Sequence, residues 1–434
     1  MQGTPHAGGR PTRLSRRGFL GLAGFAGASA LGVSGCGWPN RDTGRPELPT
    51  SEVREPVWVR ETGTVDALVA GPPGTLLALE FLPSQRLVQL DAATGAELWV
   101  RPVGRPYRVW WDRADGVLIP EDTGGRREWL CLDAATGRER WRAPGAGYRF
   151  EMLLVADGML LMQSRGATAA DQSGTLLALD AATGRERWRV VLPRSPGRAT
   201  AGGGFFVTYG LGADLTVIDQ ATGVVRWTAV TAGLTSPRVR DGVVFGATYE
   251  TGFIARELAT GVPRWEFPAE DPQHVSVAGD LVYAEAGDLV VALDRASGRR
   301  LWRIKAGIPG HKWPSQAIHV VDSGTLFTSV GRYDLQGDEA EGESYGGLAA
   351  YDAATGHRRW WYDAGGMSTD TVLPTAGVVC MHDGRRGLHA IDVATGRRLW
   401  WYDTGSELAE PLVVSADLVA GIAIGRSRLF ALRP

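Results

Sequence analysis

Histidine and cysteine, the residue types that most often bind metals or carry redox chemistry, are few in this chain of 434 residues. His311 and His319 flank Trp313 and are the closest approach to a pair of imidazole ligands. Lys312 lies between them, and no carboxylate stands at the spacing that a metal site requires. We therefore expect both histidines to lie on the surface or in loops, and the sequence predicts no metal site.

An acidic segment, Asp334–Glu343, supplies the oxygen atoms that calcium ions prefer. Its acidic residues lack the ordered spacing of a calcium loop, so the segment is expected to be a solvated insertion. Two cysteines, Cys131 and Cys380, lie within short apolar runs that are far apart in the chain. They are expected to be small buried residues and not a disulfide pair.

The chain begins with a segment that has the charge-then-apolar order of a targeting peptide. Arg16 and Arg17 precede a Gly/Ala-rich apolar run that ends at residue 35, and the pair resembles a twin-arginine export signal. The stretch Val33-Ser34-Gly35-Cys36 resembles a lipobox, so the thiol of Cys36 is expected to receive diacylglycerol after residues 1–35 are removed. An uncleaved anchor helix is the alternative, but six glycines in the run disfavour a stable span.

Residues 36–55 are expected to form a lipidated, flexible tether, because they are rich in Pro, Arg, Asp and Glu and poor in apolar residues. The lipid would hold the mature protein at the outer leaflet, which predicts an extracytoplasmic protein anchored to the cell membrane. The twin-arginine route transports folded proteins, some with a cofactor and some without, so the signal is weak support for a cofactor.

Residues 56–434 must form the folded part, and they repeat one motif eight times. The motif has Asp (Glu in one copy), then Thr-Gly or Ser-Gly three and four positions on, then Trp eight positions on, as in Asp180, Gly184 and Trp188. Alternating apolar residues precede the Asp and a second apolar stretch begins at the Trp, which is typical of a β-hairpin. The Asp side chain can accept bonds from the turn amides, and Gly supplies the positive φ that closes the turn.

The tryptophan of each motif is expected to dock on a neighbouring unit, where its ring can bury on the order of 200 Å². The period carries about four short strand signals and no sustained helical pattern, which predicts an all-β fold, a β-propeller of four-stranded blades. An orphan strand around Trp58 and three strands within 412–432 would complete one blade from the two ends of the chain. The count of eight repeats plus one composite leaves eight or nine blades open. The docking residues are Trp58, Trp99, Trp141, Trp188, Trp227, Trp265, Trp302, Trp360 and Trp400.

The motif resembles the pyrroloquinoline-quinone (PQQ)-type repeat of quinoprotein dehydrogenases and of BamB-type lipoproteins, and the resemblance covers residues 56–434. Dehydrogenases of this type commonly carry two adjacent cysteines, a catalytic Asp and Glu/Asn/Asp calcium ligands. The chain has neither adjacent cysteines nor a Cys-x-x-Cys-His haem motif, so we expect no cofactor and no catalysis. The resemblance implies a scaffold that binds an envelope protein or a small ligand; the alternative is a PQQ-dependent dehydrogenase or a sugar-processing enzyme, which a pair of buried carboxylates over the pore would favour.

The charge balance argues against nucleic acid as a partner. The chain has 46 basic and 48 acidic residues, and removing residues 1–35 takes away four arginines and no acid, which changes the formal charge from −2 to about −6. The protein is expected to be a monomer.

Successive antiparallel strands place the Asp/Thr-Gly turns on one face of the ring and the second-to-third connections on the other. Loops on that second face are expected to lengthen at Pro120–Arg127, Ser164–Ser173 and Gly331–Gly346, which makes it the candidate binding face; unselected insertions are the alternative. The second aromatics in Trp110-Trp111, Trp360-Trp361 and Trp400-Trp401 are expected to pack between blades, with a carbohydrate or peptide platform as the alternative. Candidate partner contacts are Arg126, Arg127, Arg165, Asp338, Glu339 and Glu341.

Overall fold

Short apolar runs separated by turn residues produce a chain of strands. The computed structural model describes residues 53–81, 84–104, 110–112, 116–123, 126–144, 151–165, 173–210, 213–231, 233–305, 320–331, 346–364, 372–375, 377–383, 387–405, 408–415, 417–423 and 427–434. The chain separates into the units Met1–Glu47 and Leu48–Pro434, and every described residue belongs to the second. Within these ranges no helix has the length and apolarity needed to cross a membrane.

The described residues form nine four-stranded sheets, which we number as blades 1 to 9. Blade 1 contains β2 (Val65–Ala70), β3 (Thr75–Glu80), β4 (Arg86–Asp91) and β5 (Glu97–Pro102); blade 2 contains β6 (Trp110–Asp112), β7 (Gly116–Thr123), β8 (Arg126–Asp133) and β9 (Glu139–Pro144); blade 3 contains β10 (Glu151–Ala156), β11 (Met159–Arg165), β12 (Gly174–Asp180) and β13 (Glu186–Leu192). Blade 4 contains β14 (Arg198–Gly202), β15 (Phe205–Gly210), β16 (Ala213–Asp219) and β17 (Val225–Ala229); blade 5 contains β18 (Thr235–Arg240), β19 (Val243–Thr248), β20 (Gly252–Glu257) and β21 (Pro263–Phe267); blade 6 contains β22 (Pro272–Ala278), β23 (Leu281–Ala286), β24 (Leu289–Asp294) and β25 (Arg300–Lys305). Blade 7 contains β26 (Val320–Asp322), β27 (Thr325–Gly331), β28 (Gly346–Asp352) and β29 (Arg358–Asp363); blade 8 contains β30 (Val372–Thr375), β31 (Val378–His382), β32 (Gly387–Asp392) and β33 (Arg398–Asp403); blade 9 contains β34 (Leu408–Ser415), β35 (Leu418–Ala423), β36 (Arg428–Leu432) and β1 (Trp58–Glu61).

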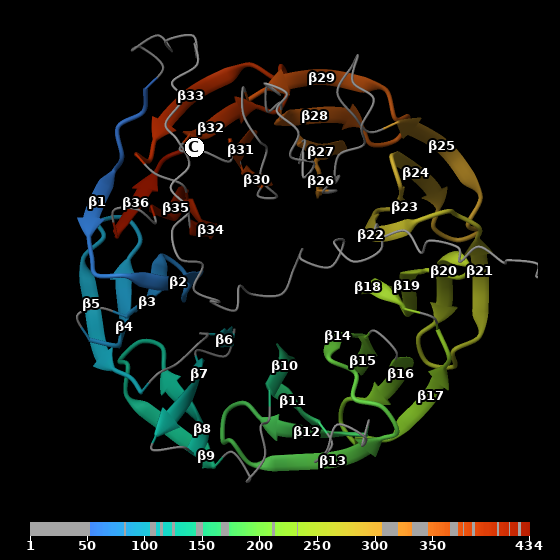
Figure 1. The fold of residues 1–434 in the computed structure, drawn as a ribbon, viewed down its shortest axis with the longest axis horizontal. Coiled ribbons are helices and arrows are strands. Elements are labelled where there is room, and N and C mark those ends of the chain that lie inside the picture. Colours follow the sequence, from blue (N-terminus) through green and yellow to red (C-terminus); the bar gives the residue numbers. More distant parts are fainter. Residues whose placement is uncertain are drawn as a thin grey trace, which may run out of the picture. The chain divides into compact units, whose positions relative to one another are not determined.

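The blades follow one another around a ring, with the first strand of each nearest the centre and the fourth at the outer edge (Figure 1). Middle strands such as β19 and β35 are buried along their whole length, because neighbouring blades cover both faces of the sheet. Outer strands such as β5 alternate between exposed and half-buried residues, since one of their faces meets solvent. The fold is therefore the all-β propeller that the repeat predicts.

The Asp/Thr-Gly turn has the geometry that its residues predict. In blade 3, the amide and hydroxyl of Thr183 donate to Asp180 Oδ1 at 2.9 Å and 2.8 Å. Gly184 has a φ of 67° and donates its N–H to the carbonyl of Asp180 at 2.8 Å. The ring of Trp141, from the preceding blade, fills the space in which a Cβ of residue 184 would lie. Glycine therefore serves both the turn and the docking of the ring.

The two ends of the chain close the ring, as expected. Strand β1 pairs antiparallel with β36, with Trp58 opposite Ala431 and Glu61 opposite Arg428. This pairing makes blade 9 from both ends and settles the blade number at nine in the described chain. Before it joins blade 9, the chain contacts β33 of blade 8: Val53 forms a parallel bridge with Trp401.

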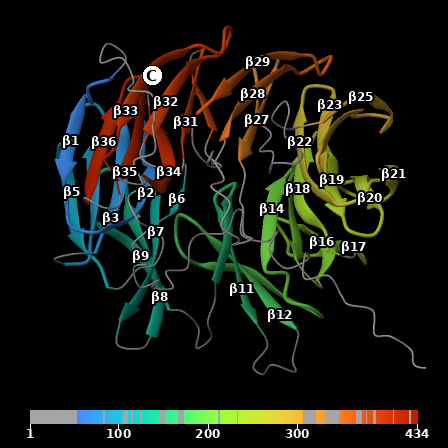
Figure 2. The ribbon, with the colours of Figure 1, turned by 45° about the horizontal axis from the view of Figure 1, so that its top comes forward.

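One expectation about loops was wrong. Residues 120–127 are not a long loop, because β7 and β8 pair from Gly116–Asp133 to Thr123–Arg126. Ser164 and Arg165 likewise pair with Thr175 and Gly174 in a long β11–β12 hairpin. Continued backbone pairing satisfies N–H and C=O groups that a loop would leave to water, and it extends the hairpins past the turn residues that marked their predicted ends. These two hairpins belong to adjacent blades, which lie side by side in both views (Figures 1 and 2).

Candidate functional site

Each docking tryptophan reaches from the outer strand of one blade to the hairpin turn of the next. In seven cases the indole Nε1 donates to the carbonyl of the residue after the turn Asp or Glu, at 2.8–2.9 Å. In eight cases the ring covers the turn glycine. The seven donors are Trp58, Trp99, Trp141, Trp188, Trp227, Trp265 and Trp360. These contacts join the blades into one frame.

The Nε1 atoms of Trp302 and Trp400 are buried without a hydrogen-bond partner in the described part of the chain. Trp302 still covers its glycine, but the carbonyl of Ala353 accepts instead from the hydroxyl of Tyr283, at 3.0 Å. Burial, together with the charge of Asp352, raises the pKa of Tyr283 to about 12. Trp400 packs against blade 9, whose third and fourth strands come from opposite ends of the chain and share no hairpin turn.

The residue before the docking tryptophan is arginine in five blades, and there it binds the acidic residue of its own turn. In blade 4, Arg226 donates to Asp219 Oδ2 at 2.7 Å. This hydrogen bond is the main reason why the pKa of Asp219 is lowered to about 2. The same position is apolar in Val57, Leu98, Leu301 and Leu399. The five pairs are Arg140–Asp133, Arg187–Asp180, Arg226–Asp219, Arg264–Glu257 and Arg359–Asp352.

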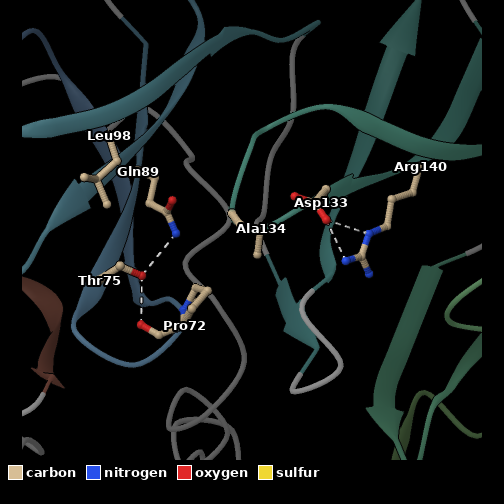
Figure 3. A pocket seen from close by; sticks show the side chains of 8 residues that line it. Pro72, Thr75, Gln89, Leu98, Asp133, Ala134 and Arg140 are labelled. Carbon is tan, nitrogen blue, oxygen red and sulfur yellow. Dashed lines mark hydrogen bonds and ion pairs between the residues drawn. The ribbon is translucent and has the colours of Figure 1, made fainter.

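A pocket of about 430 Å³ lies on the turn face between blades 1 and 2 (Figure 3). Leu98 forms part of its wall, and the Asp133–Arg140 pair lines it from the next blade. Gln89 donates to Thr75 Oγ1 at 3.1 Å, and Thr75 donates to the carbonyl of Pro72 at 2.8 Å. The polar groups of the pocket are thus bound to one another, which favours a structural hollow over a reactive site.

Four carboxylates, Glu80, Glu121, Glu285 and Asp383, are 0–5% exposed, and they lie in four different blades. A pair of buried carboxylates is the feature that would favour the alternative of a quinone-dependent or sugar-processing enzyme. Carboxylates that act together as general acid and base face one another across a substrate, so the partners of Glu80, Glu121 and Asp383 bear on the question.

Glu80 and Glu121 are bound by arginines. Arg86 contacts Glu80 Oε2 at 2.6 Å through both Nε and Nη2. Arg142 Nη1 donates to Glu121 Oε2 at 2.9 Å. Burial alone would lower the pKa of Arg142, but its hydrogen bonds to three glutamates raise that pKa. The amide of Gly104 donates to Glu121 Oε1 at 3.2 Å. Separate ion pairs of this kind hold strands together and do not form an acid–base pair.

A chain of hydrogen bonds connects blades 7 and 8. The hydroxyl of Tyr362 lies 2.6 Å from His389 Nδ1, and His389 Nε2 lies 3.4 Å from Asp383 Oδ2. In a neutral imidazole with the proton on Nε2, Nε2–H would donate to Asp383 and Nδ1 would accept from the hydroxyl of Tyr362. Asp383 also accepts from the amide of Gly387 at 2.9 Å. Because His389 is 2% and Asp383 0% exposed, the chain of bonds is a buried link between blades rather than a surface site for substrate.

The pattern of the sequence did not reveal this link. Tyr362 and His389 are 27 residues apart and meet only because two blades pack together. Next to them lies His382, which is 4% exposed and whose pKa burial lowers to about 4. In the described residues, no group of three His, Cys, Asp or Glu side chains could hold a metal ion. His311 and His319 lie outside the described residues.

The expectations for cysteine and for one second aromatic were confirmed. Among the described residues neither Cys131 nor Cys380 forms a disulfide; both are at most 1% exposed, and burial raises the pKa of Cys380 to about 12. Trp361 packs into the apolar cluster between blades 6 and 7, so it contributes to packing between blades. The side chains of Trp110 and Trp111 lie outside the described part.

The structure brings three predicted partner contacts to one end of two adjacent blades. Arg126 and Arg127 begin β8, and Arg165 ends β11, all at the hairpin ends opposite the Asp/Thr-Gly turns. We call this side the hairpin face. Asp338, Glu339 and Glu341 lie outside the described residues, as do Arg16, Arg17 and Cys36, and the side chains of the three arginines are not described.

Comparisons with solved structures identify the same architecture in proteins of different activity. The chain resembles BamB from Moraxella catarrhalis with a TM-score of 0.50 and 15% identity, over 75% of this chain and 96% of that one. It resembles the quinohemoprotein alcohol dehydrogenase ADHIIG from Pseudomonas putida HK5 with a TM-score of 0.50 and 15% identity, over 87% of this chain and 76% of that one. At these identities the likeness is one of fold alone.

Sequence comparison gives a more specific result. The serine/threonine-protein kinase AfsK of Streptomyces coelicolor is 29% identical over 150 residues, which is 34% of this chain and 16% of the kinase. The chain therefore spans only a small part of that protein. The family model described as outer membrane protein assembly factor BamB matches residues 83–289 and 286–434, which together are well over half of the chain. A nine-bladed ring of PQQ-like repeats whose sequence matches that model places the chain in the BamB family.

Proposed function

We propose that the protein is an extracytoplasmic scaffold, tethered to the membrane through lipid on Cys36, that binds an envelope protein or a small ligand on its hairpin face and performs no catalysis. Two observations together carry this proposal. Buried carboxylates of the ring are bound by groups of the protein itself, and some β-hairpins are longer than those of the other blades. Strands β7 and β8 have eight residues each, whereas β3 and β4 have six. Long elements on a rigid frame are where binding residues concentrate.

The internal partners of the carboxylates support the scaffold over an enzyme. Glu80 and Glu121 are bound by arginine, and Asp383 is bound by a backbone amide and by His389. A quinone-dependent or sugar-processing reaction needs groups that are free to exchange protons with a substrate. The family model is described as an outer membrane protein assembly factor, and the solved BamB has a similar ring, which supports a binding role without assigning the partner.

The hairpin face is tested by shortening its loops in the full chain. Replacing Leu335–Ser344 with a short Gly-Ser loop, and trimming the tips of the β7–β8 and β11–β12 hairpins, should keep the melting temperature and abolish capture of partners from native envelope. The matched control is a Gly-Ser insertion beside Gly158, in the β10–β11 turn on the opposite face, where no docking ring packs. If capture survives the shortening of all three segments, binding on this face is refuted.

A further inference from the structure

Arg198, the first residue of β14, is half-buried and has no acidic partner. Within the described residues, no hydrogen bond or ion pair joins its guanidinium to another side chain. Other half-buried arginines are bound by carboxylates, among them Arg86, Arg142 and Arg295. Partial burial of a cation is unfavourable unless an opposite charge compensates for the lost water. Arg198 is therefore a candidate for binding an anion that the chain itself does not supply.

The side chain of Tyr209 lies on the same face of blade 4 as Arg198. The two residues are directly opposite each other in the β14–β15 ladder, which sends their side chains to one side of the sheet. Tyr209 packs in the apolar cluster between blades 4 and 5, with Leu234 and Val239. A Cβ on Gly202, four residues after Arg198 on the same face of β14, would lie 2.8 Å from Cγ1 of Val239. Arg198 and Tyr209 thus both face blade 5.

Both residues lie at the hairpin-face end of blade 4. Strand β14 runs from Arg198 to the first turn of the blade, where the carbonyl of Gly204 accepts from the amide of Gln220, next to the Asp/Thr-Gly turn. Arg198 is consequently at the opposite end, and Tyr209 is the second-last residue of β15 before the β15–β16 connection. Strands β14 and β18 lie side by side at the inner edge of the ring (Figures 1 and 2).

The charges around the Tyr209 hydroxyl are positive. Burial raises the pKa of Tyr209, and the charges of Arg198 and Arg238 act in the opposite direction. Arg238 is an exposed residue of β18 that donates to the carbonyl of Pro237 at 3.3 Å. Because the pKa of Tyr209 is raised, its hydroxyl is protonated at neutral pH and can donate a hydrogen bond. A guanidinium and a phenol donor beside a second cation suit a negatively charged oxygen ligand.

The repeat itself does not require this pair. Tyr209 is four residues after the first residue of its strand, and in other blades the residues at that position and opposite it are small, apolar or uncharged. The corresponding pairs are Ala67 and Leu79 in blade 1, Thr235 and Ala247 in blade 5, and Ala409 and Ile422 in blade 9. Those blades fold into the same four-stranded sheets without an arginine and a tyrosine. The pair in blade 4 is therefore an addition to the frame.

We propose that Arg198 and Tyr209 form a binding site for an oxyanion, a carboxylate or a phosphate group, on the hairpin face between blades 4 and 5. The planar guanidinium offers two parallel N–H donors to two oxygens of the anion, and the phenol offers a third donor. This inference rests on the proposed binding role of the hairpin face, and it names the chemical group that this face recognises.

The test is isothermal titration calorimetry of the purified full chain with inorganic phosphate and, separately, with succinate. Sodium chloride keeps the ionic strength constant, so that general screening does not change during the titration. Saturable binding with a dissociation constant of about millimolar is expected for at least one anion. Tighter binding of phosphate would identify a phosphate ligand, and tighter binding of succinate a carboxylate ligand.

Four variants separate the site from the overall charge. Arg198→Gln should weaken binding by about tenfold or more, because it removes charge-assisted hydrogen bonds. Arg303→Gln removes the same charge from an exposed position on β25 and should bind as the wild type does. Arg198→Lys keeps the charge but loses the paired donors, so it should also bind more weakly. Tyr209→Phe keeps the ring in its apolar cluster and should weaken binding by about threefold.

Melting temperatures without added anion show whether each variant is folded, and Tyr209→Phe carries the test if Arg198→Gln is not. Two results would overturn the anion site: no saturable binding of either anion, or an equal loss of affinity in Arg198→Gln and Arg303→Gln. Both results concern this site alone, because a partner could still bind elsewhere on the hairpin face. The role of that face is tested separately, by capture after its loops are shortened.

Discussion

Gly184→Ala perturbs the turn glycine of blade 3, whose Cα supports the docked ring of Trp141. A Cβ built on Gly184 would lie 2.6 Å from Cε3 and 2.7 Å from Cδ2 of that ring, which is closer than side-chain carbons approach. The ring cannot easily retreat, because its Nε1 donates to the carbonyl of Ala181 at 2.9 Å. The substitution should therefore separate two blades as well as strain the turn.

Gly158→Ala in the first turn of the same blade is the matched control. Gly158 has a φ of 71°, close to the 67° of Gly184, but a Cβ there would meet nothing within 4 Å. Each substitution should lower the free energy of unfolding by about 1–2 kcal/mol, because alanine disfavours the left-handed conformation. Only Gly184→Ala also overpacks a buried contact, which typically costs about 1–3 kcal/mol more.

The assay compares the chemical-denaturation midpoints of the wild type and both variants. The midpoint of Gly184→Ala should fall further than that of Gly158→Ala, by an amount equivalent to about 1–3 kcal/mol. Tryptophan emission of the native Gly184→Ala protein should shift to longer wavelength, since a docking ring becomes more exposed. Equal midpoints for the two alanine variants would refute the idea that the turn glycine serves tryptophan docking.

Four further outcomes are expected. Cys36→Ser should release the protein from membranes washed with carbonate, because the lipid is the proposed anchor. Titration of the purified protein with PQQ and calcium should leave its absorbance and melting temperature unchanged, and a micromolar complex would contradict the scaffold proposal. Arg226→Leu should raise the pKa of Asp219 from about 2 toward its usual value. Because a lowered pKa stabilises the folded state above about pH 4, the variant should be less stable than the wild type near neutral pH. Denaturation measured at several pH values should show that this difference vanishes as the pH falls to about 2. Tyr283→Phe should cost less than about 1 kcal/mol in thermal unfolding, because Trp302 can donate to the carbonyl that the tyrosine leaves.

The repeat made most of the fold predictable from the sequence. The Asp/Thr-Gly/Trp spacing predicted the hairpin, the blade and the docking of the tryptophans on neighbouring units, because the pattern is repeated eight times in the sequence. The unpaired strand at Trp58 and the missing fourth strand after Leu432 predicted how the ring closes. Local rules sufficed here since, within each blade, every strand pairs with its neighbour in sequence, except in blade 9, where β1 pairs with β36.

The rest depended on contacts between blades and on pairing beyond the turns. The bond between Tyr362 and His389 forms across a blade boundary, and no local spacing marks it. Residues 120–127 read as a loop because they contain proline and glycine, but cross-strand pairing continued through most of them. The sequence also did not predict that Tyr283, and not Trp302, donates to the carbonyl of Ala353, because Ala353 lies 70 residues away from the tyrosine in the chain.

Photo-cross-linking from the two ends of blade 2 in native envelope tests the central claim most directly. A photoreactive amino acid would replace Arg126, at the hairpin end, or Ala135, in the exposed Asp/Thr-Gly turn of the same blade. The scaffold account predicts a discrete adduct from position 126 and none from position 135. An adduct from position 135 alone would place the partner on the turn face and contradict the account, as would the absence of any adduct from position 126.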